Sequence, residues 1–372
     1  MRWLFWGAVG VIAYAYLGYV AWLYLRGFWR PWPVRRAPFF PFISIVMAVR
    51  NEEHLLHQKL SNLLQIDYPV ELLEIVVASD GSGDRTEQIL REHTSSGRVR
   101  VIANSVPRGK AACLNDAMQI ARGELIVFTD ARQLIEPNAI RLLAENFADQ
   151  EVGCVSGQLM LGNVSDGESA KGLGLYWKIE KQIRTLESNS GSVVGATGAL
   201  YAVRKSNIVA IPAGTILDDV YLPMHVVKQG KRSMFDSRAR AWDDPDLGKG
   251  HEFARKVRTL TGNYQLLQLA PWLLSSRNPI RFEFISHKLT RLLVPFALIA
   301  TLLSPLVLHG PVYSFALFLQ LALYAFSLLS MLRVRGPLAR AADGAFTFVM
   351  LNAAALVAFG NFVFSRKAAW SR

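Results

Sequence analysis

The stretch Ile75-Val-Val-Ala-Ser-Asp-Gly-Ser-Gly-Asp84 decides the fold of this 372-residue chain. Its apolar run stops at Asp80 and turns through two glycines, a pattern typical of a β-strand that ends on a carboxylate. A second run of the same kind, Leu125-Ile-Val-Phe-Thr-Asp130, also ends on aspartate. Each aspartate could simply cap the next helix. Because both end apolar strands at what would be one edge of a sheet, we favour a shared functional site.

Strands alternate with helices around these two runs, which predicts βαβ units, a parallel sheet and an α/β fold. The expected strands are 43–49, 74–79, 99–103, 124–129 and 153–161, and the expected helices are 51–65, 86–92, 109–121, 136–148 and 170–186. Right-handed crossovers let such a sheet start in its middle, so the fourth strand should lie beside the first, opposite the second. Asp80 and Asp130 would then flank the carboxyl end of the first strand, where open α/β sheets bind ligands.

Loops at the same edge carry further candidates. Asn51 and Glu52 follow the first strand as candidate donor-binding residues, and we expect Asn51 to cap the next helix. Asp84, with Glu87 three residues on, fits a capping box. Lys110 lies at the start of a later helix, where a lysine suits phosphate. The P-loop and GxGxxG spacings are absent, which counts against an ATPase and a dehydrogenase.

Two later stretches also have the composition of a binding or catalytic site. Gly191-Ser-Val-Val-Gly-Ala-Thr-Gly198 is either a plain tight turn or a place where backbone approaches a ligand closely, with Gly195, Thr197 and Gly198 as candidate acceptor contacts. Asp218 and Asp219 are either a helix cap or paired carboxylates. Such a pair raises the pKa of one member, which suits a general base.

Hydrophobic residues make up 51% of the chain and concentrate in residues 4–25, 292–308, 312–332 and 345–364. Each segment approaches the roughly 20 apolar residues of a membrane helix, so we expect a multi-pass membrane protein with a retained N-terminal anchor. Arginines after the first segment outnumber Arg2 before it, which places the chain beyond that segment in the cytoplasm. The basic tail 366–372 conflicts with four crossings: either the tail breaks that rule or the last segment does not cross.

The net charge of +12 is compatible with nucleic acid, anionic lipid or a phosphorylated substrate, but the four apolar segments argue against nucleic acid. Much of the basic excess lies beside those segments, where it meets anionic headgroups. Cys113 and Cys154 are the only cysteines. We expect two buried thiols in a reduced compartment.

Residues 252–288 alternate Arg and Lys with Phe, Leu and Trp. Helices with one basic and one apolar face lie in the membrane interface, which would bring Arg255 and Arg258 near a diphosphate. The expected division of the chain is a membrane anchor at 1–28, a catalytic domain at 42–245, interfacial helices at 246–291 and C-terminal membrane helices at 292–364.

Five motifs in order carry a resemblance to a known family. They are Ser44-Ile-Val-Met-Ala-Val-Arg-Asn-Glu52, Ser79-Asp-Gly-Ser-Gly-Asp-Arg-Thr86, Arg108-Gly-Lys-Ala-Ala-Cys-Leu-Asn115, Phe128-Thr-Asp-Ala-Arg132 and Leu217-Asp-Asp-Val220. Together they resemble the membrane-integrated family 2 glycosyltransferases, the group of the hyaluronan, chitin, cellulose and poly-N-acetylglucosamine synthases. The motifs cover residues 42–264, and the apolar segments match by layout.

The resemblance implies a Rossmann-like GT-A fold that binds a nucleotide diphosphate sugar, usually UDP-linked, with one Mg²⁺ or Mn²⁺ ion. It implies an inverting transfer of a hexose or N-acetylhexosamine to a lipid-linked or polysaccharide acceptor, in envelope or exopolysaccharide synthesis at a bacterial inner membrane. By motif, Asp80 would read the uridine, Lys110 would bind the donor and Asp130 would hold the metal. Asp219 would be the base, and Arg258 would steady the leaving diphosphate.

Three motifs depart from the family pattern. Arg132 stands where a second metal-binding aspartate is expected, and we expect it to contact the donor instead. Asp218 replaces a glutamate, and Arg255 and Thr259 replace a glutamine and a tryptophan. We still expect a metal. His251 is either an ordinary surface histidine, the interpretation we prefer, or an additional ligand.

The missing tryptophan belongs to the acceptor end of the family site. We therefore favour transfer of one or a few sugars, with processive synthesis of a secreted polymer as the alternative. An inactive scaffold or sugar-nucleotide sensor of the same fold is a third hypothesis, which the presence of Asp80, Asp130 and Asp219 argues against. The apolar segments hold almost no ionisable residues, which argues against a transporter.

Overall fold

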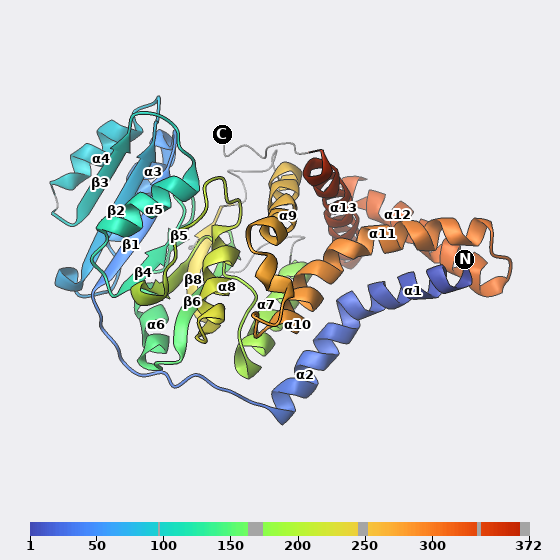
Figure 1. The fold of residues 1–372 in the computed structure, drawn as a ribbon. Coiled ribbons are helices and arrows are strands. Elements are labelled where there is room, and N and C mark those ends of the chain that lie inside the picture. The colour runs from blue at the N-terminus through green and yellow to red at the C-terminus, as the bar shows by residue number, and fades with distance from the viewer. Residues whose placement is uncertain (96, 163–173, 245–251, 333–335, 365–372) are drawn as a thin grey trace.

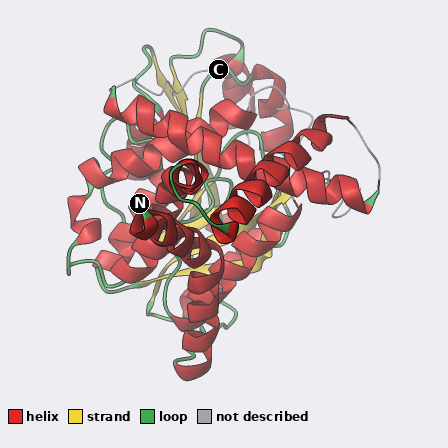
Figure 2. Ribbon diagram, turned by 90° about the vertical axis from the view of Figure 1, so that its right-hand side faces the viewer, coloured by secondary structure: helices red, strands yellow, loops and turns green. Residues whose placement is uncertain are grey.

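The chain forms a sheet-containing domain at one end and a group of long apolar helices at the other (Figure 1). The structure is a computed structural model that describes residues 1–95, 97–162, 174–244, 252–332 and 336–364. A proline-rich segment without helix or strand, residues 31–42, runs from the first long helix to the sheet. Figure 2 views the molecule from the helical end, with the strands behind the helices.

An eight-stranded mixed sheet, in the order β3-β2-β1-β4-β7-β6-β8-β5, forms the centre of the domain. Its strands are β1 (Ile43–Val49), β2 (Leu73–Asp80), β3 (Val99–Asn104), β4 (Leu125–Phe128), β5 (Leu134–Ile135), β6 (Val152–Leu161), β7 (Tyr201–Arg204) and β8 (Arg232–Asp243). β1 pairs in parallel with β2 on one side and with β4 on the other. The predicted position of the fourth strand beside the first is therefore confirmed.

The other half of the sheet is not the all-parallel arrangement that the alternation predicts. β7 runs antiparallel to both β4 and β6, and β5 runs antiparallel to β8. Neither β7 nor β8 is among the expected strands, because β7 has only four residues and β8 interleaves charged with apolar ones. Helix α7 (Gly174–Ser190) lies between β6 and β7 in the chain, yet the two strands are antiparallel, so a helix between two strands is not sufficient to predict that they run in parallel.

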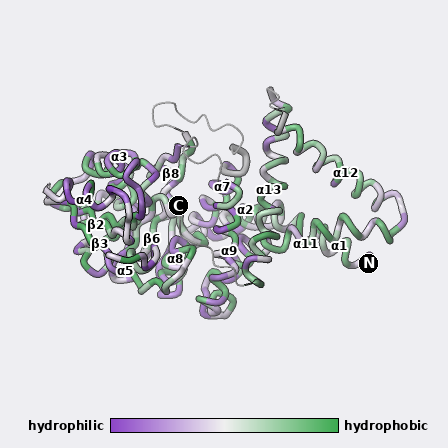
Figure 3. The backbone as a smooth tube through the Cα atoms, turned by 90° about the horizontal axis from the view of Figure 1, so that it is seen from above, coloured by the Kyte–Doolittle hydropathy of each residue, from purple (hydrophilic) through white to green (hydrophobic). Residues whose placement is uncertain are grey.

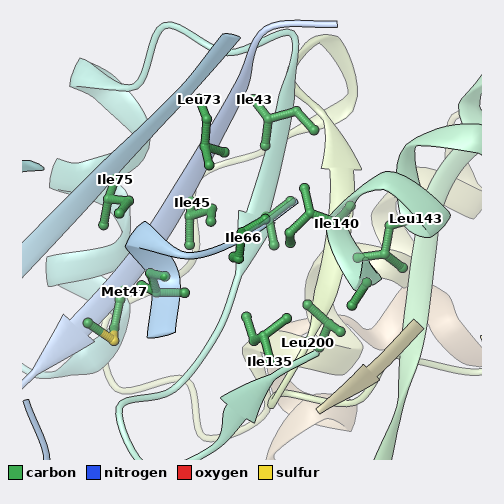
Figure 4. Packing of buried hydrophobic residues seen from close by; sticks show 14 of the residues in the cluster. Ile43, Ile45, Met47, Ile66, Leu73, Ile75, Ile135, Ile140, Leu143 and Leu200 are labelled. Atoms are coloured by element: carbon green, nitrogen blue, oxygen red, sulfur yellow. The ribbon is translucent and has the colours of Figure 1, made fainter. Parts of the chain in front are cut away.

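Helices cover both faces of the sheet and build two cores. They are α3 (Glu53–Leu64), α4 (Thr86–Thr94), α5 (Lys110–Ile120), α6 (Ala139–Glu145), α7 (Gly174–Ser190) and α8 (Asp218–Lys228). Because side chains alternate along a strand, Ile45 and Met47 of β1 pack with α3, α4 and α6, whereas Val46 and Ala48 pack with α5 and α8. Figure 4 shows the first core, with Ile45 beside Ile66. Burial on both faces fixes the strand ends where the site lies.

The predicted N-cap of α3 is wrong. The helix begins at Glu53 with Glu52 as its N-cap, while Asn51 has a φ of +53°, a left-handed conformation that asparagine tolerates. The Asn51 side-chain carbonyl accepts the Gly83 N–H at 2.9 Å. Asn51 therefore ties the loop after β1 to the loop after β2 instead of capping a helix.

The predicted capping box at Asp84 forms only in part. One carboxylate oxygen of Asp84 accepts the Thr86 N–H at 3.0 Å, and the other accepts the Glu53 N–H at 3.1 Å at the start of α3. Glu87 does not close the box, because it pairs with Arg91 at 3.4 Å along the same helix. Asp84 thus joins the N-termini of two helices at the ligand edge.

Among the described residues, four helical segments are long and apolar enough to cross a membrane, as predicted, and Figure 3 shows their hydrophobic character. They are Arg2–Trp29, Arg281–Leu306, Pro311–Leu328 and Pro337–Val363. The first joins α1 (Arg2–Ala13) and α2 (Tyr19–Trp29), and the second joins α10 (Arg281–Phe284) and α11 (Thr290–Leu303), each through a π-helical turn. α12 (Pro311–Leu328) and α13 (Pro337–Val363) are the other two. The second segment begins at Arg281, earlier than the predicted residue 292.

Two helices connect the sheet domain to the apolar helices. α9 (Glu252–Leu269) lies in the stretch predicted to form interfacial helices, and it packs against α13. α7 packs against α2. Cys113 and Cys154 are free and buried, as predicted.

Candidate active site

Three acidic side chains and one lysine meet beyond the carboxyl ends of β1 and β4. Asp130 follows β4, Asp218 and Asp219 begin α8, and Lys110 begins α5. Lys110 Nζ lies 3.0 Å from Asp130 Oδ1 and 3.2 Å from Asp218 Oδ1. Burial lowers the pKa of Lys110, but the two carboxylates outweigh burial and raise it, so the lysine stays charged. Residues far apart in sequence thus form one cluster, of which the strand-end pattern predicted the position of Asp130 but not those of Asp218 and Asp219.

Asp219 has the properties of a proton acceptor. Its side chain is half-buried, and its Oδ2 accepts the Gly198 N–H at 3.1 Å. Burial and the neighbouring Asp218 raise the pKa of Asp219 to about 6, while Lys110 opposes the shift. A carboxylate with a pKa closer to neutrality takes a proton from a hydroxyl more readily than an ordinary aspartate does.

Asp218 is held in place by two partners. Besides its ion pair with Lys110, its Oδ2 accepts a hydrogen bond from the Tyr201 hydroxyl at 3.3 Å. Tyr201 in turn stacks on Phe128 of β4, with ring centroids 4.6 Å apart. Asp218 is therefore a fixed negative neighbour that raises the pKa of Asp219.

The small-residue stretch 191–198 lies directly against the acidic cluster. Gly195 has a φ of +92°, and a Cβ there would lie 2.9 Å from Val220 Cγ2, so a side chain would meet both strain and a clash. A Cβ on Gly198 would lie 3.2 Å from Asp219 Oδ2 and 3.8 Å from Asp130 Oδ2. Glycine at 198 therefore leaves room beside the two carboxylates.

Asp80 lies at the carboxyl end of β2, as predicted, and its side chain contacts the turn before α5. Its side chain is fully buried, and its oxygens accept the Arg108 N–H at 2.6 Å and the Gly109 N–H at 3.0 Å. The Cys113 thiol also donates to Asp80, at 3.3 Å. Asp80 therefore stabilises the turn before α5, the helix that begins with Lys110.

The predicted donor-binding arginines divide into two groups. Arg132 forms an ion pair with Asp243, and Arg255 pairs with Glu252 and lies 3.8 Å from Asp243. Arg258 is half-buried, and within the described part of the chain its guanidinium makes no hydrogen bond or ion pair. Arg258 is therefore free to bind an anion, whereas Arg132 and Arg255 already have carboxylate partners.

Lys59 lies beneath the loop that carries Asp130 and was not among the predicted site residues. Its side chain is fully buried on α3, and Nζ donates to Thr129 Oγ1 at 2.8 Å and to the Gln133 carbonyl at 2.6 Å. Burial lowers the pKa of Lys59 to about 7, with Asp130 opposing. The available signal was its position in α3, because residue 59 falls on the apolar face with Leu56 and Leu60.

We expect Lys59→Met to lower kcat/KM for sugar transfer about tenfold, equivalent to ~1.4 kcal/mol. The reason is that the Thr129–Gln133 loop loses both hydrogen bonds that it receives from Lys59, so Asp130 is less well positioned. Steady-state kinetics on the purified variant measures the loss. Gln58→Met, on the exposed face of the same helix, is the control and should behave as wild type. Unchanged kinetics in Lys59→Met would contradict this role.

The residues present fit a divalent ion that arrives with a diphosphate. Among the described residues no group of three His, Cys, Asp or Glu side chains could hold a metal by itself. The Asp130 side chain is 40% exposed, and Asp219 lies beside it. One or two carboxylates with substrate phosphates and water are the usual ligands of Mg²⁺ at nucleotide sites. His251 lies outside the described residues.

A mixed α/β sheet with a lysine and aspartates at its strand ends, and four apolar helices among the described residues, fit one class of protein, the GT-A-type glycosyltransferases. Residues 44–208 match the sequence profile of the family Glycosyl transferase family 2. This part of the chain therefore matches the family that the motifs resemble, and the resemblance is confirmed.

Curated relatives and a solved structure agree with this class. The poly-β-1,6-N-acetyl-D-glucosamine synthase of Staphylococcus epidermidis is 25% identical over 234 residues, which cover 62% of this chain and 56% of the relative. The enzyme of the same name from Staphylococcus aureus (strain COL) is 24% identical over 229 residues, 60% of this chain and 55% of the relative. The chain thus matches little more than half the length of these relatives.

The solved structure is a mannosyltransferase from Pyrobaculum calidifontis in complex with GDP-Man and Mn²⁺. It aligns with 98% of this chain and 99% of its own, with a TM-score of 0.75 at 20% sequence identity. At that identity the likeness concerns the fold. Because it covers nearly the whole chain, it includes the apolar helices as well as the sheet.

Proposed function

We propose that this protein is an inverting, membrane-embedded glycosyltransferase. It would move a hexose or N-acetylhexosamine from a nucleotide diphosphate sugar, of the UDP-linked kind, to a lipid-linked or polysaccharide acceptor. The observation that carries the proposal is Asp219, a carboxylate with a raised pKa beside Lys110 and Asp130 at the ligand edge of the sheet. The names of the curated relatives, which are polysaccharide synthases, support a glycan acceptor.

In the proposed reaction the acceptor hydroxyl gives its proton to Asp219 while its oxygen attacks the anomeric carbon of the donor. The bond from that carbon to the diphosphate oxygen breaks, and the nucleoside diphosphate leaves with the electron pair. Attack from the face opposite the leaving group inverts the anomeric configuration. Lys110 and the unpaired Arg258 would hold the charge that develops on the diphosphate.

The donor would lie across the carboxyl ends of β1 and β2. The turn that Asp80 fastens supplies backbone groups at the nucleoside end, and Asn51 with Glu52 forms the facing loop. A divalent ion bound by Asp130 would neutralise the diphosphate. Gly195, Thr197 and Gly198 would border the acceptor, because they adjoin Asp219 on the side of the small-residue stretch.

We expect activity to fall at least tenfold in excess EDTA and to return with Mn²⁺ or Mg²⁺, because a diphosphate leaving group needs charge neutralisation. Asp130→Asn should raise the metal concentration needed for half-maximal activity, which a titration measures. Gln150→Asn, in the turn before β6, is a control. Full activity in EDTA would mean that Lys110 and Arg258 neutralise the diphosphate without an ion.

The membrane arrangement is part of the proposal. The four apolar segments would cross a bacterial inner membrane, with the catalytic domain at 42–245 in the cytoplasm and the interfacial helices at 246–291 along its surface. The basic flank after the first segment supports this orientation. The last segment is as apolar and as long as the others, which favours four crossings despite the basic tail.

A processive polymer synthase is the second candidate, because the curated relatives are named as synthases. Thr259, in place of the family tryptophan, is exposed on α9, so the acceptor end lacks an aromatic platform at that position. We expect short products. Size-exclusion analysis at limiting enzyme checks this, and long chains formed while most acceptor is unextended would establish processive synthesis instead.

A further inference from the structure

A small cavity lies between β6, α7 and the small-residue stretch, next to the residue that holds Asp219. Its volume is about 40 Å³, and Gln158, Lys181, Arg184 and Thr197 are among the residues that line it. At roughly 10–15 Å³ per water this is space for about three water-sized groups. A phosphate or a carboxylate fits such a space, whereas a whole sugar ring does not.

The cavity wall carries more positive than negative charge. Lys181 and Arg184 contribute cations, and Glu180 is the one acidic residue among the described residues that line it. Glu180 is already shared by Arg184 at 3.3 Å, by Arg291 at 2.8 Å and by His287 at 3.2 Å. Burial raises the pKa of Glu180, but these basic partners outweigh it and hold the pKa well below its usual range. The carboxylate is therefore neutralised by its own partners, Arg184 among them, and Lys181 is the lining cation that forms no ion pair with the described residues.

Polar groups on the wall have unused hydrogen-bonding capacity. Thr197 Oγ1 accepts a hydrogen bond from Arg184 Nη1 at 2.6 Å, which leaves the threonine proton available to a ligand. The Gln158 amide NH₂ donates only to the Met160 sulfur, a weak acceptor, so its second N–H is available to a ligand. Lys288, nearby, makes no hydrogen bond or ion pair within the described chain, yet lies within electrostatic range of Glu180 and Asp219.

The position of the cavity connects the candidate base with the apolar helices. Thr197 precedes Gly198, whose N–H holds Asp219 Oδ2. On the other side, Glu180 binds His287 and Arg291, which lie in the first turns of the segment Arg281–Leu306. A group in the cavity would therefore lie between the hydroxyl that is glycosylated and the surface of the membrane.

We propose that this cavity binds a phosphate group of the acceptor, the one that links the sugar being extended to its lipid. The inference rests on the proposed glycosyl transfer and adds the chemical class of the acceptor. Lys181 and Arg184 would bind the phosphate oxygens through charge-assisted hydrogen bonds, with Thr197 and the Gln158 amide as neutral donors. A neutral polysaccharide end would leave Lys181 without a negative partner, and for that reason we favour a phosphorylated acceptor.

The test compares two acceptors that differ only in phosphate. Full-length protein in phosphatidylcholine nanodiscs is given the radiolabelled nucleotide sugar that it turns over, with either farnesyl-diphosphate-linked N-acetylglucosamine or the farnesyl glycoside of the same sugar. We expect wild type to prefer the diphosphate acceptor at least tenfold in kcat/KM. Lys181→Gln and Arg184→Gln should each lose most of that preference, mainly through a higher KM for the diphosphate acceptor.

The preference is a ratio within one protein sample, so partial misfolding of a variant does not imitate the result. Lys178→Gln removes an exposed lysine of the same helix outside the cavity lining and should retain the preference. Equal use of both acceptors by wild type, or a preference that persists in both cavity variants, overturns the inference. If added phosphatidylglycerol abolishes the acceptor preference, and Lys181→Gln leaves the preference unchanged, the cavity binds a lipid headgroup. That result also overturns the inference. If no nucleotide sugar is turned over at all, the proposed function itself fails.

Discussion

Asp219→Asn should reduce glycosyl transfer by a factor of roughly 100 or more, the scale of general-base catalysis, while the nucleotide sugar still binds. Asparagine keeps the shape of the side chain and can still accept the Gly198 N–H, but it cannot take a proton. The loss should appear in kcat, because donor binding depends on Lys110 and Arg258 and not on the base. Single-turnover transfer together with equilibrium binding of the donor measures the two effects separately.

The pH profile provides the control on this assignment. The pKa of about 6 predicts that wild-type kcat/KM falls as the pH drops below 6, because the base becomes protonated, and that this limb disappears in the residual activity of the variant. That pKa lies above the ordinary aspartate value, so stability from Asp219 is present at acid pH and is lost as the pH rises through 6. Asp219→Asn should therefore melt no lower than wild type at pH 8.

Transfer by Asp219→Asn at a near wild-type rate would show that Asp219 is not the base. Asp67→Asn is the control for replacing an aspartate by its amide, because the Asp67 side chain is 70% exposed.

Lys110→Met should nearly abolish activity and also destabilise the domain. The Lys110 side chain is 21% exposed and is the cation between Asp130 and Asp218, so its removal leaves carboxylates close together without compensation. Breaking a largely buried ion pair costs about 3 kcal/mol, and the diphosphate loses a cation as well. Thermal unfolding and donor binding measure the two losses.

Two further variants separate charge from packing at this position. Lys110→Arg keeps the charge and should recover most of the stability but less of the activity, because a guanidinium does not reproduce the single-point contacts of an ammonium. Lys178→Met, at an exposed lysine of α7, should leave stability and donor binding unchanged. A Lys110→Met protein that melts and binds donor as wild type does would contradict the cluster as described.

Apolar runs that end on aspartate were enough to predict the first half of the sheet and the site at its edge. The crossover argument places β4 beside β1, and with it Asp130 near the residues that begin α5 and α8. This works because register and handedness constrain parallel strands strongly. β7 and β8 escaped prediction because a four-residue strand and a strand rich in charged residues carry weak periodic signals.

Side-chain partners were harder to predict than strand positions. Asp80 has the motif of a ligand-binding residue, yet its oxygens are taken by backbone N–H groups of the turn at Arg108 and Gly109. Arg132 has a partner, Asp243, that is 111 positions away in sequence. No local pattern shows such contacts, because they depend on how β5 and β8 lie in the folded sheet. The cavity at Lys181 and Arg184 could not be predicted from sequence motifs either, because its lining residues come together only in the folded chain.

The most direct test of the central claim is to incubate purified full-length protein in nanodiscs with a panel of radiolabelled nucleotide sugars and a bacterial lipid extract as acceptor. The account predicts that one UDP-sugar labels a lipid-linked or polysaccharide product, that the new linkage has the inverted anomeric configuration, and that Asp219→Asn forms less than about 1% of that product. Retention of configuration would contradict the mechanism. Absence of transfer or hydrolysis with every donor would contradict the proposed function.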